Sequence, residues 1–277
     1  MVIGSMPVFI DGHVHIYPDF SLDQFLEAAS VNFSRAAGMD RIAGEIQYVL
    51  ALTESEGFNV FDELKQKAVA PDETGDGGGS AFSFSFHCTA EQESLIARKG
   101  DVCMILVSGR QIISREKLEL LSLCSSFTVK DRTLSLADLA ETVAASGGLP
   151  VIPWGAGKWF GGRGRTVECL LQSDHEYPLF LGDSGNRPGF WPDGALFAEA
   201  ADLCIPVLSG SDPLPLPFHV NRPGSFGTFI PYGLLSMDRP AASLLQLLCD
   251  EKGITGFGRR IGSFRFIFEQ LRINIRR

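Results

Sequence analysis

The chain has 277 residues, of which 45% are hydrophobic and 21% charged, and its formal net charge is −9. This composition is typical of a globular protein with a sizeable core, and the negative charge argues against general nucleic-acid binding. No apolar run is long enough to span a membrane, and the N-terminal MVIGSMPVF lacks the pattern of a signal peptide. We therefore expect a cytoplasmic protein with no membrane partner, whose six scattered cysteines are reduced.

Strand-like apolar runs alternate with helical patterns along the chain. The expected strands are 8–13, 46–53, 101–108, 118–124, 149–154, 178–183 and 205–210. The expected helices include 21–29, 58–68, 90–98, 135–146, 193–203, 240–250 and 261–273. Such alternation favours a parallel sheet covered on both faces. About seven units without a linker predict a single domain over 1–277, a seven-stranded TIM-like α/β barrel with the helices of 240–273 packed on it. An open, doubly wound sheet is the alternative.

The stretch VFIDGHVHIYP, residues 8–18, places two histidines directly after an apolar strand. Residues i and i+2 of a strand point to the same side, so the imidazoles of His13 and His15 face one way. This geometry suits two nitrogen atoms that converge on one cation. A pair of solvated or hydrogen-bonded histidines is the alternative.

Polar residues lie at the ends of the expected strands, where a βα barrel carries its catalytic groups, and Glu119 lies at the start of the fourth one. In chain order they include Glu54, Arg110, Gln111, Glu119, Lys158, Arg163, Asp183, Asn186, Arg187, Ser211 and Asp212. The loop GKWFGGRGR at 157–165 combines glycines with Lys158, Arg163 and Arg165, a composition that can bind an anion. A solvated basic loop is the alternative there. His219 follows Asp212 by seven residues and is a further candidate for substrate contact.

The order of these segments resembles the polymerase and histidinol phosphatase (PHP) family. The matching blocks lie within 8–230: the HxH of His13 and His15, ALTES at 51–55, GRQIISREKLELLSL at 109–123, GGLPVIPWG at 147–155 and GSDPL at 210–214. Several family ligands are replaced, by Ser55, Gln111, Glu119 and Leu214, whereas His13, His15 and Asp212 match. The HxH and the late Asp also resemble the amidohydrolase superfamily, in which a carbamylated lysine after the fourth strand often bridges two metals. Lys158 follows the fifth expected strand.

The PHP resemblance implies a distorted barrel and a metal-dependent phosphoesterase that acts on a small anionic substrate. Two histidines and one carboxylate can hold one divalent cation, such as zinc, manganese or iron. His13, His15 and Asp212 are the expected ligands, and Glu119 is a further candidate. The expected catalytic residues are Glu54, Lys158 and Asp183, and the expected substrate-binding residues are Arg110, Lys158, Arg163, Arg187 and His219.

Two other functions stay open at this point. One is hydrolysis of an amide or a lactone at the same cation. The other is a barrel without catalysis that binds a small anion or a partner protein. The oligomeric state is open as well.

Overall fold

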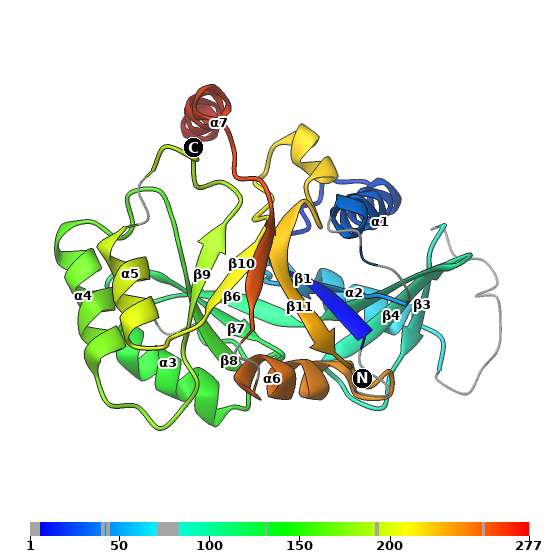
Figure 1. The fold of residues 1–277 in the computed structure, drawn as a ribbon, viewed down its shortest axis with the longest axis horizontal. Helices are drawn as coiled ribbons and strands as arrows, with labels where there is room; N and C mark the ends of the chain where they lie inside the picture. Colours follow the sequence, from blue (N-terminus) through cyan, green and yellow to red (C-terminus); the bar gives the residue numbers. More distant parts are fainter. Residues whose placement is uncertain are drawn as a thin grey trace.

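The computed structural model describes residues 6–39, 42, 45–70, 83–130, 132–191, 194–250 and 253–276. Within these ranges the chain forms twelve strands and seven α-helices (Figure 1). The strands are β1 (Met6–Val14), β2 (Gln47–Leu52), β3 (Ser85–Cys88), β4 (Ser94–Lys99), β5 (Val102–Val107), β6 (Gly109–Ile113), β7 (Glu119–Leu123), β8 (Leu149–Pro153), β9 (Phe180–Ser184), β10 (Val207–Gly210), β11 (Phe226–Gly233) and β12 (Thr255–Gly258). The helices are α1 (Leu22–Met39), α2 (Val60–Gln66), α3 (Leu136–Ala145), α4 (Gly161–Gln172), α5 (Ala195–Asp202), α6 (Pro240–Asp250) and α7 (Ser263–Arg276), with a 3₁₀ helix η1 (Pro217–Asn221). In this part of the chain no helix is both long and apolar enough to cross a membrane.

All twelve strands belong to one mixed sheet. Its order is β3-β4-β5-β2-β1-β11-β10-β9-β8-β7-β6, and β12 pairs with β11. The α/β class is therefore confirmed, but the sheet does not close, and a seven-stranded parallel barrel is not shown. An isolated bridge between Glu54 and Arg110 brings β6 beside the end of β2. The single-domain organisation stays a prediction.

Short connections explain why the sheet is mixed rather than parallel. A parallel pair needs a crossover of a dozen or more residues, whereas a tight turn reverses the chain. Gly100 and Asp101 join β4 to β5, and five residues join β6 to β7. The helix predicted over 90–98 is wrong for this reason. Gly100 has φ +56°, which allows the turn, and residues 94–99 pair with β5 along their whole length.

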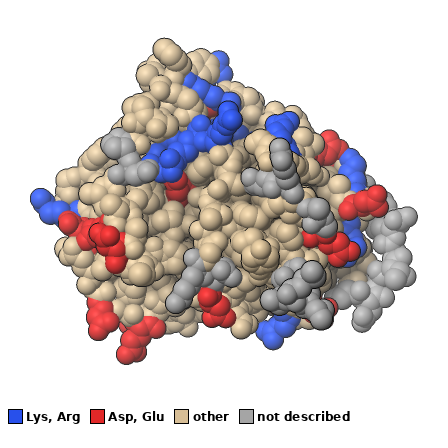
Figure 2. All heavy atoms as spheres, viewed as in Figure 1, with Lys and Arg blue, Asp and Glu red and all other residues tan. Residues whose placement is uncertain are grey.

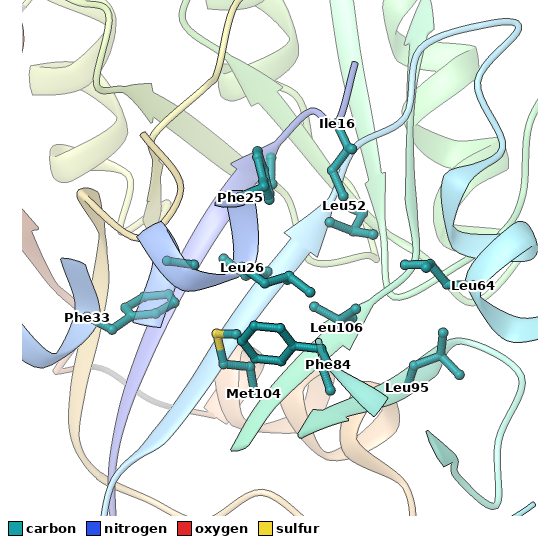
Figure 3. Packing of buried hydrophobic residues seen from close by; sticks show 14 of the residues in the cluster. Ile16, Phe25, Leu26, Phe33, Leu52, Leu64, Phe84, Leu95, Met104 and Leu106 are labelled. Atoms are coloured by element: carbon teal, nitrogen blue, oxygen red, sulfur yellow. The ribbon is translucent and has the colours of Figure 1, made fainter. Parts of the chain in front are cut away.

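Helices cover the sheet where its strands are parallel. Phe25, Leu26 and Phe33 of α1 pack toward Leu52 of β2 and Leu106 of β5 (Figure 3). Across the molecule, α3, α4 and α5 cover β8 and β9 through a second apolar cluster (Figure 1). The strands between these two groups carry the polar residues considered below, and α7 lies at the same end of the molecule as the tip of β9 (Figure 1).

Candidate metal centre

His13 and His15 lie at the end of β1, on the strand that the sequence predicts. Both are buried, with 5% of each residue exposed. Their Nε2 atoms are 2.9 Å apart, which is a hydrogen-bond distance, so the two imidazoles point at one place. The strand pairs with β2 on one side and β11 on the other, which fixes its backbone.

Asp212 approaches the two imidazoles from the segment after β10. Its Oδ1 lies 3.7 Å from the Nε2 of His13 and 3.9 Å from that of His15. Its backbone N–H donates to the carbonyl oxygen of His13 over 2.8 Å. Gly210 makes this approach possible, because a Cβ atom there would lie 2.2 Å from the backbone nitrogen of His13. The fold thus brings two segments that lie about two hundred residues apart in the chain to one point.

Hydrogen bonds from neighbouring strands hold the Asp212 segment. The Ser184 hydroxyl donates to Oδ2 of Asp212 over 2.9 Å, and the Asn186 amide donates to its carbonyl oxygen over 2.5 Å. Behind the site, the buried carboxylate of Asp11 accepts the backbone N–H groups of Ser211 (2.7 Å) and Gly224 (2.8 Å). Burial raises the pKa of Asp11 to about 6. Metal ligands supported in this way keep their orientation without the ion.

The electrostatics of the three side chains favour metal binding. Burial and the neighbouring His13 lower the pKa of His15 to about 3, so its imidazole is neutral and offers a lone pair. Burial opposes ionisation of Asp212, but the facing imidazoles and the Ser184 hydroxyl outweigh it, and its pKa lies below the ordinary value. A neutral imidazole and an ionised carboxylate are the forms in which these side chains bind a divalent transition metal.

The spacing of the donor atoms also fits one cation. The three ligand atoms lie within 4.8 Å of one another. Donors bound about 2.1 Å from one ion lie about 3 Å apart at a right angle and about 3.4 Å apart in a tetrahedron. The 2.9 Å between the imidazole nitrogens matches the right angle of a facial arrangement, and a small movement of Asp212 would complete it.

A pocket of about 540 Å³ opens beside these donors. Its lining residues are His13, His15, Tyr17, Gln111, Glu119, Trp154, Gly155, Ala156, Lys158, Asn186, Asp212, Leu214, Pro215, Gln270 and Ile273. Burial and the charges of Asp212 and Glu119 raise the pKa of Tyr17, whose hydroxyl therefore stays protonated and can donate a hydrogen bond. A small polar molecule can thus reach the three donors.

Two further predicted site residues, Lys158 and Glu119, line this pocket. The Lys158 ammonium lies 3.2 Å from Oε1 of Glu119. The side chain of Lys158 folds over Gly155, where a Cβ atom would come within 2.7 Å of it. The glycine-rich loop therefore places the ammonium group of Lys158 in the same pocket as the three donors.

Four other residues that the sequence predicts for the site form two ion pairs and do not line the pocket. Arg110 lies 3.0 Å from Oε2 of Glu54, whose other oxygen accepts the N–H of Phe61 at the start of α2. Burial raises the pKa of Glu54. Arg187 donates two hydrogen bonds to Asp183, over 2.7 and 2.9 Å. None of these four residues is among the described residues that line the pocket.

Arg163 and His219 also lie outside the lining residues. Arg163 donates to the carbonyl oxygen of Gly157 over 2.8 Å and so closes its own loop. His219 is fully buried. Its Nδ1 accepts the N–H of Leu214 over 2.9 Å, and its Nε2 lies 3.0 Å from Oε1 of Glu269 on α7.

Sequence reasoning missed Tyr17 and α7 as parts of the pocket. Tyr17 follows His15 by two residues, so the spacing that selected the histidines could have selected it too. Gln270 and Ile273 carry no such signal, because only the fold brings the C-terminal helix to this place. Gln111 stands where the PHP pattern has a ligand, and here its side chain forms a hydrogen bond with His15.

Comparisons with known proteins show a likeness of fold. No family model matches the chain, and no curated protein matches it. The crystal structure of PsfC from Pseudomonas syringae PB-5123 is similar to it, with a TM-score of 0.51 and 15% identity over 98% of this chain and 97% of that one. A two-domain protein from Bacteroides vulgatus, described as containing a predicted PHP-like metal-dependent phosphoesterase, gives a TM-score of 0.44 and 12% identity over 93% of this chain and 66% of that one. The comparison with PsfC shows that PsfC has a similar fold over nearly the whole of both chains.

Proposed function

We propose that this protein is a metal-dependent hydrolase that cleaves a phosphate ester, with one divalent cation held by His13, His15 and Asp212. The observation that supports the proposal most is the convergence of three donor atoms within 4.8 Å at the wall of a pocket. A divalent cation at such a site lowers the pKa of a bound water molecule and supplies a nucleophile at neutral pH. Zinc, manganese and iron all suit this donor set.

The remaining pocket residues can bind the substrate and handle a proton. Lys158 can bind a phosphoryl oxygen, because its ammonium lines the pocket and provides a charge-assisted hydrogen bond. The protonated hydroxyl of Tyr17 can donate a second hydrogen bond. Glu119 pairs with Lys158 inside the pocket and can accept a proton there, whereas Asp183 and Glu54 pair with arginines and do not line the pocket. A cationic side chain beside the donors favours a phosphate ester over an uncharged amide or lactone.

Metal content and hydrolysis measured together test the proposal. We expect about one cation per chain in protein purified without chelator, and its loss in His13→Ala and Asp212→Ala. Asp202→Ala, an exposed carboxylate at the end of α5, is the matched control and should keep the cation. Zinc, manganese and iron should each be offered to chelator-treated protein. A wild-type chain that retains none of them contradicts the metal site.

Lys158→Met separates substrate binding from metal binding. We expect an unchanged metal content and a KM for phosphate esters that rises about tenfold, because one charge-assisted contact is lost. The substrate panel should include phosphate monoesters and diesters, an amide and a lactone. Metal binding without turnover of any phosphate ester would contradict the proposed reaction and favour a binding protein or the amidohydrolase alternative.

A further inference from the structure

Helix α7 turns an apolar face away from the protein. Phe264, Ile267, Phe268 and Leu271 recur at i, i+3, i+4 and i+7, and their exposed fractions are 91%, 53%, 48% and 58%. A surface helix ordinarily buries such a stripe and exposes its polar side. Here the polar Glu269, which is 1% exposed, lies on the buried side. Contiguous exposed apolar residues of this kind indicate a binding surface.

The orientation of α7 is fixed by buried polar contacts. Glu269 accepts a hydrogen bond from Arg265 over 2.7 Å and faces Nε2 of His219 over 3.0 Å. If α7 turned its apolar stripe inward, Glu269 would become exposed to solvent. His219 would then stay buried without Glu269 as its partner. The outward stripe is therefore a stable feature of the folded chain.

Aromatic contacts also link the other side of α7 to the wall of the pocket. Phe266 of α7 contacts Trp191, with ring centroids 6.2 Å apart, and Trp191 contacts Trp154 of the pocket wall, with centroids 5.8 Å apart. Phe160 and Phe190 are exposed, and each packs against the same Trp191. Two further exposed phenylalanines thus share Trp191 with α7 and with the pocket wall.

This apolar surface is surrounded by positive charge in an acidic protein. Residues 259–277 contain six arginines and one acidic residue, in a chain with a net charge of −9. Among the described residues, Arg259, Arg265 and Arg272 have exposed side chains, and the one acid, Glu269, is buried. Figure 2 shows Lys and Arg gathered in a band beside the end of the molecule where α7 lies in Figure 1.

We propose that α7, with Phe160 and Phe190, docks on an anionic lipid surface. A helix with arginines beside a stripe of Phe, Ile and Leu has the character of one that lies flat in the headgroup region. Anionic headgroups complement the arginines, and the acyl boundary accepts the stripe. A symmetric pair of copies would instead bring the arginines of both helices together, which is repulsive. The proposal is independent of the hydrolase function and involves no membrane-spanning helix.

Vesicle co-sedimentation with the full chain tests this docking. The probes are vesicles of phosphatidylglycerol and phosphatidylcholine, and vesicles of phosphatidylcholine alone. We expect binding to the anionic vesicles, weakened by salt, together with a blue shift of tryptophan emission as Trp191 leaves water. Phe264→Ser/Phe268→Ser should reduce the binding constant roughly tenfold or more, since two exposed aromatic groups are removed.

Two further variants test the contribution of charge and the specificity of the phenylalanine effect. Arg259→Gln/Arg272→Gln should weaken binding and flatten its salt dependence. Tyr232→Ser removes an aromatic side chain that is 76% exposed on β11, toward the α6 end of the molecule, and should bind as the wild type does (Figure 1). Circular dichroism checks that each variant is folded. Absence of binding to anionic vesicles, equal binding by the phenylalanine variant, or a dimer that the same variant dissociates would each overturn lipid docking.

Discussion

Asp11 is a buried carboxylate whose hydrogen bonds join β1 to the segments that carry Ser211 and Gly224, next to the candidate metal centre. The sequence places it beside His13 and His15 and gives no sign that its role differs from theirs. In the structure it accepts backbone N–H groups from Ser211 and Gly224 and does not line the pocket. His13 and His15 line the pocket and can bind a metal ion, whereas Asp11 faces backbone N–H groups and holds the surrounding segments in place.

Asp11→Ala should therefore destabilise the fold more than an ordinary surface change. It leaves two buried backbone N–H groups without an acceptor, and we expect a loss of about 3 kcal/mol in the free energy of unfolding. Urea denaturation followed by circular dichroism measures this loss. Asp19→Ala, an exposed acid on the loop after β1, is the control and should change stability by less than about 0.5 kcal/mol. Equal stabilities of the two variants would show that Asp11 does not tie the segments together.

At the scale of elements, the helix α7 depends on a buried pair that responds to acid. Burial lowers the pKa of His219, which faces Glu269, Arg222 and Arg265. Burial opposes ionisation of Glu269, but hydrogen bonds with His219 and Arg265 outweigh it and lower its pKa as well. For both groups the folded-state pKa lies below the ordinary value, so their stabilising contribution is present at neutral pH and is lost as the pH falls.

We expect α7 to open more readily below pH 6.5, the ordinary pKa of histidine, and more readily again below pH 4.5, that of glutamate. Hydrogen exchange, corrected for the intrinsic rate at each pH, should show protection of the α7 amides falling at least several-fold between pH 7 and pH 5. Helix α3 serves as the internal control. Glu269→Gln should lower protection at pH 7 and reduce its dependence on pH. An α7 whose protection follows that of α3 at every pH would contradict this account.

Considered as a whole molecule, the protein draws its three candidate metal donors from segments about two hundred residues apart. His13 and His15 come from the first strand of the sheet, and Asp212 follows the tenth. A ligand that binds only this assembled site stabilises the fold, because the unfolded chain cannot hold the three donors together.

A bound divalent cation should therefore raise the apparent Tm. At a free concentration about one hundred times its Kd, the gain is about 2.7 kcal/mol, or on the order of 5 °C for a chain of this size. Differential scanning calorimetry of chelator-treated protein, with and without added zinc or manganese, measures the shift. The shift should disappear in Asp212→Ala and persist in Asp202→Ala. A Tm that does not respond to any cation in the wild type argues against a site shared by β1 and β10.

Local pattern was enough to predict the α/β class, most of the helices and the strand that carries His13 and His15. Apolar periodicity and the residues that begin and end helices act over a few positions, so they can be read without the fold. The same rules failed at residues 94–99. Helix and strand propensities are weak there, and pairing with β5 decided the outcome.

The sequence by itself determined which residues could bind a cation, because imidazole and carboxylate chemistry is fixed by residue type and by the alternation along β1. Only the tertiary structure decided that Asp212 meets the two imidazoles, while Glu54 and Asp183 are engaged by arginines. It also decided that the sheet is mixed and open and that α7 lines the pocket with its apolar face outward. The physical reason is that contacts between distant segments depend on strand order and on close approaches such as that of Gly210 to His13, which short-range pattern does not encode.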